Sequence, residues 1–555
     1  MTSMPLTTPV FRYDPLPYDA VLPAMLAAVA GAHGANDLVV TATADGAVER
    51  ITYADAEIRA ADMAARLFAA GVTKGVRVGI LAPNGADFVT AFLAVARIGA
   101  VAVPINTFYQ PAELHWVLRD ADIHTLLAVE TLLGRDMLDR IGAAAGEWQV
   151  VNGQLRIERL PQLRNVLPLG VFPLRATRRE WPSAWPDPVP QSFLKACEAT
   201  VRAADDLLVI YTSGSTSNPK GIIHTHRTAI THSRFIATAH DWDHSDRIYV
   251  PMVFFWVAGL VFGFLGPMQV GATILTEHKF DAGTALRLLE SEKATYTTGF
   301  PHIGPALANH PDFASTDLSN LREGYQQVLL APERRAPDPS LRVAQLGMTE
   351  TCSSHTWWPP HHQVPDSKRG SLGVAAPGYE HKIVDDAGNE VPNGVTGEIC
   401  VRGMAMMRGM VGKHWYEVVD RDGWLHTKDA GYRDDDGHLY FAGRLDEMIK
   451  TSGTNVAPME VEAALRRIEA VRIAYVVGLP DPDKGAIVSA AVVLNEGYTA
   501  SADELVAECR RRLAAYKVPK KWVILSDHPG RLPYTTTNKI DKARLTELMA
   551  TGELS

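Results

Sequence analysis

The chain has 555 residues, more than one ordinary hydrophobic core accommodates, so we expect at least two domains. With 46% hydrophobic and 21% charged residues it has the composition of a soluble globular protein, and a formal net charge of -9 argues against nucleic-acid binding. The 4 cysteines are widely separated and form no C-x-x-C pair, which excludes a disulfide scaffold, offers no zinc signature and suits a reducing cytoplasm.

The first third of the chain alternates between strand and helix patterns. The expected elements, in chain order, are a hairpin (39–43 and 49–52), a helix (54–67), a strand (77–82), a helix (86–98), a strand (100–104), a helix (110–120) and a strand (124–128). In the first helix we expect Ile58, Met63 and Leu67 to face inward. Strands separated by single helices with short breaks predict βαβ units, and therefore parallel strands in a covered sheet of an α/β protein.

Residues 251–276 carry no charge and are long enough to span a bilayer on paper. Pro267, Gln269 and several glycines interrupt them, so a buried helix leading into a core strand is the better interpretation. The N-terminus shows no basic region followed by an apolar one, so we expect no secretory signal and a cytoplasmic protein. Residues 134–185 show no clear periodicity, so we interpret them as a connecting segment and assign no functional residue to them.

The stretch Tyr211–Gly221, YTSGSTSNPKG, follows an apolar strand-like run at 207–210. Its small residues expose backbone N–H groups and hydroxyls together, and Lys220 adds a point charge, so the stretch predicts a phosphate-binding loop. It is not the P-loop of nucleotide hydrolases, because Lys220 precedes Gly221 and no Gly-Lys-Ser/Thr follows.

This stretch resembles the signature loop of the adenylate-forming superfamily, which includes acyl- and aryl-CoA ligases, nonribosomal adenylation domains and beetle luciferases. The resemblance implies a large N-terminal α/β domain (1–443), a hinge (444–446) and a small mobile α+β cap (447–555). It also implies ATP, Mg²⁺ and coenzyme A as the small molecules used. A carboxylate that attacks the α-phosphate of ATP is already ionised at neutral pH, so no general base is required.

Further motifs extend the resemblance to the ATP site. In the loop, the residues implied to hold the phosphates are Thr212, Ser213, Gly214, Ser215, Thr216 and Lys220. In LGMTET (346–351), Thr349 would contact the α-phosphate, and Glu350, with Thr216, would bind Mg²⁺, for which hard oxygen ligands are suited. Leu346 stands where the family usually has an aromatic residue over the adenine.

The C-terminal motifs supply the remaining implied roles. Asp429, in HTKD, would hold the ribose hydroxyls, and Arg444 would contact ribose and phosphate. Asp446 matches the hinge, and Gly453 lies where only glycine would leave room for the pantetheine arm of coenzyme A. Lys539, in LPYTTTNKID, is the implied catalytic cation that bridges carboxylate and α-phosphate, although Asn538 replaces the usual glycine.

The acyl pocket is implied by FFWVAG (254–259), in which Trp256 replaces the family's histidine near the reacting carboxylate. We expect this pocket to be lined by Phe254, Phe255, Trp256, Gly324 and Gly347. Trp256 is thereby grouped with Lys539 and Glu350 at the catalytic centre. Gly324–Gln327, GYQQ, replaces a small-residue loop, and Trp357 and Trp358 are further candidates. The pair His361-His362 beside Pro360 favours a loop over a metal site.

The sequence thus predicts an AMP-forming ligase that joins an apolar carboxylic acid to coenzyme A. Aromatic, alicyclic and medium- or long-chain acids all suit such a pocket. Two alternatives stay open: an adenylating enzyme that loads a carrier protein, and a non-catalytic nucleotide-binding relative. The expected partners are the acid, ATP and coenzyme A, with no nucleic acid and no membrane span; a homodimer is left open.

Overall fold

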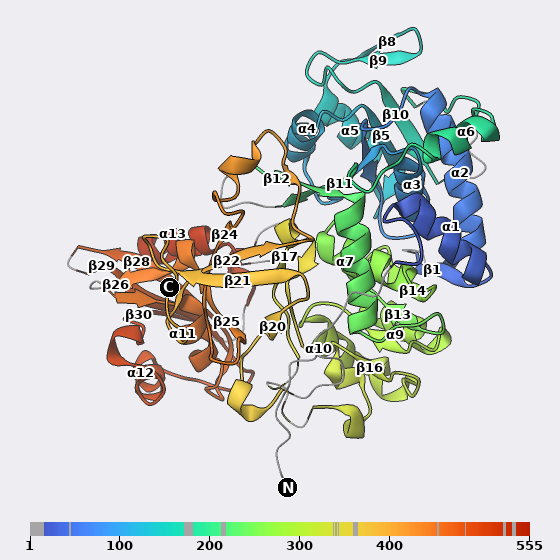
Figure 1. The fold of residues 1–555 in the computed structure, drawn as a ribbon. Coiled ribbons are helices and arrows are strands. Elements are labelled where there is room, and N and C mark those ends of the chain that lie inside the picture. The colour runs from blue at the N-terminus through green and yellow to red at the C-terminus, as the bar shows by residue number, and fades with distance from the viewer. Residues whose placement is uncertain are drawn as a thin grey trace. The chain divides into compact units, whose positions relative to one another are not determined.

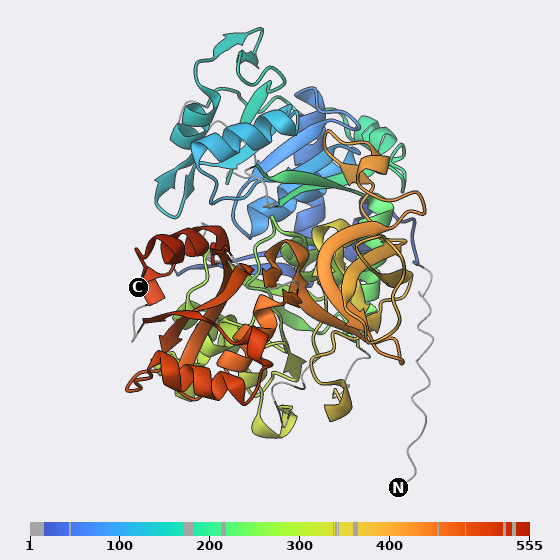
Figure 2. The same cartoon turned by 90° about the vertical axis from the view of Figure 1, so that its left-hand side faces the viewer.

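The computed structural model describes residues 16–43, 46–170, 181–212, 218–336, 338, 341, 343–358, 364–451, 454–482, 484–525, 529–534 and 540–554. Its contacts divide the chain into two compact units, drawn in Figures 1 and 2. The first comprises residues 1–380 and 402–423, and the second comprises residues 381–401 and 424–555. The proposed hinge at 444–446 therefore falls inside the second unit, and its role in motion stays a prediction.

A seven-stranded sheet organises one half of the first unit. Its strand order is β10 (Asn165–Leu169), β5 (Thr125–Val129), β3 (Arg77–Leu81), β4 (Val101–Pro104), β11 (Asp206–Thr212), β12 (Lys220–Thr225) and β23 (Gly409–Met410). The strands from β10 to β11 pair in parallel, as the βαβ pattern predicted, and β12 and β23 are antiparallel additions. The helices that connect strands of this sheet include α3 (Ala86–Arg97), α4 (Pro111–Asp120), α5 (Met137–Ala145) and α6 (Gln191–Glu198). Strand β10 lies in residues 134–185, for which no element was predicted.

A six-stranded sheet organises the other half of this unit. Its order is β16 (Glu323–Gly324), β15 (Tyr296–Thr297), β13 (Arg247–Tyr249), β14 (Thr273–Glu277), β1 (Asp37–Ala42) and β2 (Val48–Thr52). The pairs from β16 to β1 are parallel, whereas β1 and β2 form the expected antiparallel hairpin. Helix α9 (Ala282–Ser291) packs on β14 and β1. Because β13, β15 and β16 are parallel neighbours, the segments that follow them all leave the sheet at the carboxyl ends of these strands.

Helix α2 (Tyr53–Ala69) confirms the predicted helix but corrects its inward face. Met63 and Leu67 are buried, whereas Ile58 is 62% exposed. Five residues separate Ile58 from Met63, which is about 140° around a helix of 3.6 residues per turn. The buried stripe instead runs at three- and four-residue spacing through the small side chains of Ala56 and Ala60.

The uncharged segment 251–276 forms a π-helix, η1 (Ala258–Leu265), a short helix α8 (Gly266–Met268) and most of strand β14. This is the predicted helix that leads into a core strand. A Cβ atom on Gly259 would lie 1.9 Å from the carbonyl oxygen of Val253, so only glycine fits there. Within the described residues, no helix has the combination of length and apolarity that crossing a membrane requires.

The second unit contains two sheets. The first is β21 (Tyr379–Val384), β22 (Gly397–Gly403), β24 (Leu425–Arg433) and β25 (Leu439–Arg444). The second contains β27 (Thr454–Val456), β26 (Ile449–Thr451), β29 (Gly485–Leu494), β28 (Val471–Asp481) and β30 (Lys521–Leu525). Alternate residues of β28 and β29 face two cores. One core includes α11 (Pro458–Leu465) and α12 (Ala502–Arg510), and the other includes α13 (Lys542–Thr551). The α+β character expected for the C-terminal part is therefore present.

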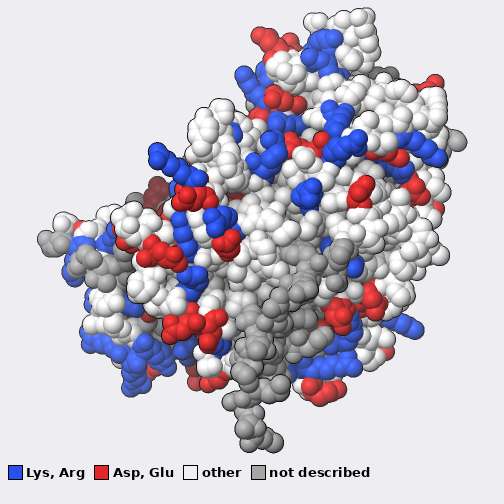
Figure 3. Space-filling view, viewed as in Figure 1, with Lys and Arg blue, Asp and Glu red and all other residues white. Residues whose placement is uncertain are grey.

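On the face drawn in Figure 3, basic and acidic side chains are interspersed over the described parts of both units. Among the exposed ion pairs of the described residues are Arg408 with Asp206 and Arg402 with Glu380. The coloured side chains that the structure describes on this face form no continuous basic stripe, which is the electrostatic feature a nucleic-acid duplex requires.

Candidate active site

The pairing of β11 with β12 brings two of the predicted phosphate contacts to a common place. Thr212, at the end of β11, lies opposite Lys220, the first residue of β12, in the antiparallel ladder. The chain between them must therefore reverse direction beside this pair. Ser213, Gly214, Ser215 and Thr216 belong to that connection and lie outside the described residues. A loop leaving the carboxyl end of a parallel strand is where open α/β sheets bind ligands.

The Thr349-Glu350 pair is attached to the same strand through a histidine. His224 on β12 donates its Nε2–H to the carbonyl oxygen of Thr349, at 2.7 Å. Burial lowers the pKa of His224 to about 4, so the ring is neutral near pH 7. Since residues i and i+4 of a strand face the same side, the turn of Thr349 lies on the face to which Lys220 belongs.

Thr349 and Glu350 begin a 3₁₀ turn, η6 (Thr349–Thr351), whose backbone is bound on several sides. The Glu350 carbonyl accepts the Met407 N–H at 2.7 Å, and the Thr351 carbonyl accepts the hydroxyl of Tyr379 at 2.6 Å. The segment around Met407 continues into β23, which pairs with β12. The strand that begins with Lys220 therefore holds the backbone of Thr349 and Glu350, whose roles in binding phosphate and Mg²⁺ stay predictions.

Phe254 packs as a core residue. Its ring is 0% exposed and contacts the rings of Phe88 and Phe264, with centroids 5.5 and 5.6 Å apart. Its backbone N–H donates to Asn84 Oδ1 at 2.8 Å, while Asn84 Nδ2 donates to the Met252 carbonyl at 2.9 Å. Asn84 thus fixes the backbone from which the next two aromatic residues project.

Those two residues begin a row of aromatic rings that reaches the surface. Phe255 contacts Phe108 and Trp256, with centroids 6.0 and 5.5 Å apart, and Trp256 contacts Phe300 at 6.2 Å. Phe300 in turn stacks with His302. Phe108 and Phe300 are 39% and 36% exposed. This aromatic row, Phe108–Phe255–Trp256–Phe300–His302, runs from the buried Phe255 to exposed rings at Phe108 and Phe300, and such rings offer the apolar contact an apolar acid would require.

Gly324 and Gly347 are both required by close backbone contacts. Gly324 has φ +149°, and a Cβ atom there would lie 2.2 Å from Thr297 Oγ1. At Gly347 it would lie 2.6 Å from the Ser353 carbonyl oxygen. Gln326, buried just after Gly324, donates to the carbonyl oxygens of Thr298 and Phe300 and so anchors the aromatic row. Whether the two glycines line an acyl pocket stays a prediction.

The ribose motif lies on paired strands of the second unit. Asp429 on β24 is opposite Arg444 on β25, and Arg444 Nη1 contacts Asp429 Oδ1 at 3.0 Å. The guanidinium also contacts Asp446, with Nε 3.2 Å from Oδ1. Burial raises the pKa of Asp429, and the neighbouring Arg444 opposes this shift. Asp429, Arg444 and Asp446, three separate predictions from sequence, are thus joined in one ionic group.

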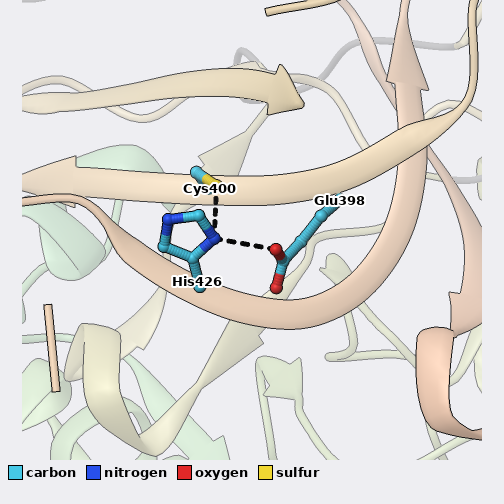
Figure 4. A group of neighbouring side chains, drawn as sticks. All are labelled: Glu398, Cys400 and His426. Atoms are coloured by element: carbon cyan, nitrogen blue, oxygen red, sulfur yellow. Dashed lines mark hydrogen bonds and ion pairs between the residues drawn. The ribbon is translucent and has the colours of Figure 1, made fainter. Parts of the chain in front are cut away.

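The turn before Asp429 has an unusual backbone. Lys428 has φ +61°, a left-handed conformation that is disfavoured for residues other than glycine. Its N–H donates to Glu398 Oε1 at 2.9 Å, and Glu398 Oε2 contacts His426 Nδ1 at 2.7 Å (Figure 4). Glu398 therefore holds both sides of the turn that presents Asp429.

Some predicted site residues lie outside the described part of the chain, and two residues that support the site carry no sequence motif. Gly453 and Lys539 lie outside the described residues, as do His361 and His362. The missed residues are His224 and Glu398, which act through backbone contacts. The only available signal was a polar residue inside an apolar strand, in GIIHT (221–225) for His224. Trp357 and Trp358 are buried, with 4% and 5% exposed.

Together the fold and these groups define a class of protein: a two-unit α/β protein with a Thr-Glu turn held by the strand that begins with Lys220, and an Asp-Arg pair on neighbouring strands of the second unit. The family model for the AMP-binding enzyme matches residues 28–411, and the model for the AMP-binding enzyme C-terminal domain matches residues 460–539. The chain belongs to the AMP-binding enzyme family. The predictions of adenylate-forming membership, of an enzyme and of a mixed α/β fold are confirmed.

Curated relatives are similar over most of their length. The chain is 33% identical to a putative acyl-CoA synthetase, YngI, of Bacillus subtilis over 90% of this chain and 92% of that protein. It is 32% identical to a feruloyl-CoA synthase of Amycolatopsis over 89% and 93%. Among solved structures, the anthranilate CoA ligase AuaEII in complex with anthranoyl-AMP matches with a TM-score of 0.78 and 25% identity, covering 97% of this chain and 99% of that one.

Proposed function

We propose that this protein is an ATP-dependent carboxylic acid:CoA ligase that acts through an acyl-adenylate and releases AMP and pyrophosphate. The observation that carries the proposal is strand β12, whose first residue is Lys220 and whose His224 bonds the turn of Thr349 and Glu350. One strand thus joins two parts of a triphosphate site. The relatives named as CoA ligases or synthetases support the same reaction.

In the first half-reaction an oxygen of the substrate carboxylate attacks the α-phosphorus of ATP. The bond from that phosphorus to the bridging oxygen breaks, and pyrophosphate leaves with the electron pair. The catalytic requirement is to bring two anions together and to neutralise the leaving charge. Lys220 and the N–H groups of the loop would bind the phosphates, and Thr349 would contact the α-phosphate. Asp429 would accept hydrogen bonds from the ribose hydroxyls, with Arg444 holding its carboxylate.

The donor set near the phosphates fits Mg²⁺, because the Glu350 carboxylate and the Thr216 hydroxyl are hard oxygen ligands. When bound, the ion would supply charge neutralisation on the phosphate oxygens. The backbone of Glu350 is fixed by the Met407 N–H, so the point from which the carboxylate projects is held in place.

In the second half-reaction the thiol of coenzyme A attacks the acyl carbon of the mixed anhydride. The carbon–oxygen bond to AMP breaks, AMP leaves, and the thiol proton is lost to solvent. We propose that the C-terminal cap, residues 447–555, turns about Asp446 between the two steps and that Gly453 leaves room for the pantetheine arm.

The aromatic row favours an apolar acid, aromatic or alicyclic or of medium to long chain, because its rings offer apolar area for such a group to cover. Acetate would leave most of this surface uncovered. A panel of acids assayed for pyrophosphate release and for loss of free thiol tests both halves. Activation of bulky apolar acids with little response to acetate is expected, whereas a preference for acetate would contradict the assignment.

Lys539→Ala should abolish adenylation while largely sparing thioester formation from supplied acyl-AMP. The reason is that the proposed cation acts only while carboxylate and α-phosphate approach each other. Pyrophosphate release and thioester formation are measured separately on the same preparation. Equal loss of both half-reactions would contradict the role of Lys539.

Two alternatives would share these motifs. An enzyme that loads a carrier protein would release pyrophosphate but would not turn over with free coenzyme A. A non-catalytic nucleotide-binding relative, suggested by Trp256 and Leu346 at departures from the family pattern, would release no pyrophosphate with any acid. A cytoplasmic location and a homodimer remain predictions that neither assay addresses.

A further inference from the structure

Strand pairing in the second unit brings a nitrogen of β24 beside a sulfur and an oxygen of β22. Cys400 on β22 lies directly opposite His426 on β24, and Glu398 lies two residues before Cys400. The Cys400 Sγ is 3.5 Å from His426 Nδ1, and Glu398 Oε2 is 2.7 Å from the same nitrogen (Figure 4). The three atoms all lie within 4.8 Å of one another.

These distances are close to those around one tetrahedral metal ion. Zinc–sulfur and zinc–nitrogen bonds of about 2.3 and 2.0–2.1 Å place the two ligand atoms about 3.6 Å apart. Sγ and Nδ1 already have this separation, at 3.5 Å. The nitrogen and the carboxylate oxygen would have to separate to about 3.3 Å, given metal–oxygen bonds of about 2.0–2.2 Å. The required shift is small for a glutamate side chain at the edge of the surface.

We propose that Glu398, Cys400 and His426 form a binding site for one borderline divalent metal ion of the Zn²⁺ type. Thiolate, imidazole and carboxylate together favour zinc or cobalt over Mg²⁺ or Ca²⁺, which prefer oxygen ligands alone. Cys400 is fully buried beside Val384 and Trp424, whereas the His426 side chain is 39% exposed. An ion can therefore enter from the histidine side, with water as its fourth ligand.

The proton balance follows from the ligand types. The S–H bond of Cys400 breaks, a metal–sulfur bond forms, and the proton passes to solvent. His426 binds through Nδ1 in its neutral form, with its proton on Nε2, while Glu398 binds through Oε2. Glu398 Oε1 keeps its hydrogen bond from Lys428 N–H. Affinity for the metal should accordingly rise with pH.

The group Asp434, Asp436 and His438 provides an internal comparison. Its members also come within 4.8 Å of one another, but it has no sulfur ligand. Asp434 Oδ1 accepts the backbone N–H groups of Asp436 and His438, at 3.0 and 2.9 Å, as in an ordinary aspartate turn. We expect no thiolate spectrum from this group.

The test is a titration of the chelator-treated full-length chain with Co²⁺ in the absence of ATP. One equivalent should bind and produce a thiolate-to-cobalt charge-transfer band in the near ultraviolet, which Zn²⁺ then abolishes by displacement. Cys400→Ser should lose the band, and His426→Gln should weaken binding about tenfold or more. Cys197→Ser, which alters a cysteine in the other unit, and Asp436→Asn should both keep it.

Absence of the band in the unmodified chain, or its persistence in Cys400→Ser, would overturn the site. Loss of the band in Cys197→Ser would also overturn it, by assigning the thiolate elsewhere. Because Cys400 is fully buried, its replacement can impair folding. His426→Gln changes a partly exposed ring and decides the question when circular dichroism shows a native fold: unchanged affinity there contradicts the proposal. Neither result depends on ligase activity, so the outcome is separate from that of the proposed function.

Discussion

Lys428 shows how a single backbone conformation shapes the ribose motif. A left-handed residue other than glycine costs about 1–2 kcal/mol. The charge-assisted hydrogen bond from Lys428 N–H to Glu398 Oε1 offsets this cost, because a bond to a charged group contributes about 1.5–3 kcal/mol. Glu398 is therefore a positioning residue for Asp429.

Glu398→Ala should raise the KM for ATP about 10-fold or more while changing kcat less, because the turn that presents Asp429 loses its acceptor. Steady-state kinetics with ATP as the varied substrate measures the effect. The double variant Glu398→Ala/Lys428→Gly should recover part of the affinity, since glycine adopts the left-handed conformation without penalty. Loss of kcat alone, with no rescue by glycine, would contradict this role.

Asp429→Asn should weaken ATP binding by about 10- to 100-fold, because an amide accepts weaker hydrogen bonds from ribose hydroxyls and no longer pairs with Arg444. The matched control is Asp446→Asn, which removes the other carboxylate bound by Arg444. The control should leave the KM for ATP within about threefold, because Asp446 is 39% exposed and such pairs contribute little. Equal effects of both changes would argue against ribose binding by Asp429.

At the scale of elements, the motifs were readable from sequence and their supports were not. The apolar run before the loop predicted β11, and the residues after it predicted a reversal. His224 and Glu398 belong to no recognisable motif, because each binds a backbone atom of a residue distant in sequence. His224 acts on a residue about 125 positions away, and Glu398 on one about 30 positions away. Ile58 was placed wrongly for a related reason, since large side chains were counted when alanines formed the contact face.

Strand β12 makes a testable connection between the phosphate loop and the Thr-Glu turn. His224→Leu fills the buried space but leaves the Thr349 carbonyl without its donor, at a cost of about 1–3 kcal/mol. We expect kcat/KM for ATP to fall about 5- to 150-fold, and His224→Gln, which retains an N–H donor, to recover part of it.

The matched control is His226→Leu. His226 is equally buried but accepts the Leu22 N–H, away from Thr349. This control should lower stability without a comparable loss of kcat/KM in the fraction that remains folded. Equal kinetic losses in both variants would mean that His224 acts only through stability.

At the scale of the whole molecule, the fold class and the two-part organisation were predictable, whereas the division between compact units was not. Residues 381–401 precede the expected hinge in sequence but belong with the C-terminal part by their contacts. Strand β22 within this segment pairs with β24 from beyond residue 424. Such long-range pairing depends on which sheet edge is available, and local composition does not reveal it.

The first unit should lose stability as the pH falls below about 6.5, because several of its histidines are buried in the neutral form. Burial lowers the pKa of His224, His226 and His240 to about 4 and that of His232 to about 3. Below pH 6.5 the unfolded chain binds protons that these rings reject in the folded chain, so folding is favoured at high pH and disfavoured as the pH falls toward 4.

Two buried carboxyl groups of the same unit act in the opposite direction. Burial raises the pKa of Glu277 to about 7 and that of Asp87 to about 6, so the folded chain takes up these protons first as the pH falls. When the histidines and the two carboxyl groups are combined, the unfolded chain near pH 5 therefore binds about two protons more than the folded chain. The free energy of unfolding should fall by about 2.7 kcal/mol per pH unit there. Urea unfolding at pH 7, 6 and 5 measures the slope.

His232→Phe isolates one proton of this balance, because a ring of similar size replaces one that titrates. Its slope near pH 5 should be about 1.4 kcal/mol per pH unit smaller than that of the unmodified chain. The second unit has a comparable histidine in His381, whose pKa burial lowers to about 4. Because four such histidines are named in the first unit and one in the second, the acid-sensitive transition should belong to the first unit. Hydrogen exchange at pH 5 should show opening there before it appears in β28 and β29. A flat dependence on pH, or earlier opening of the second unit, would show that these histidines do not control the acid stability.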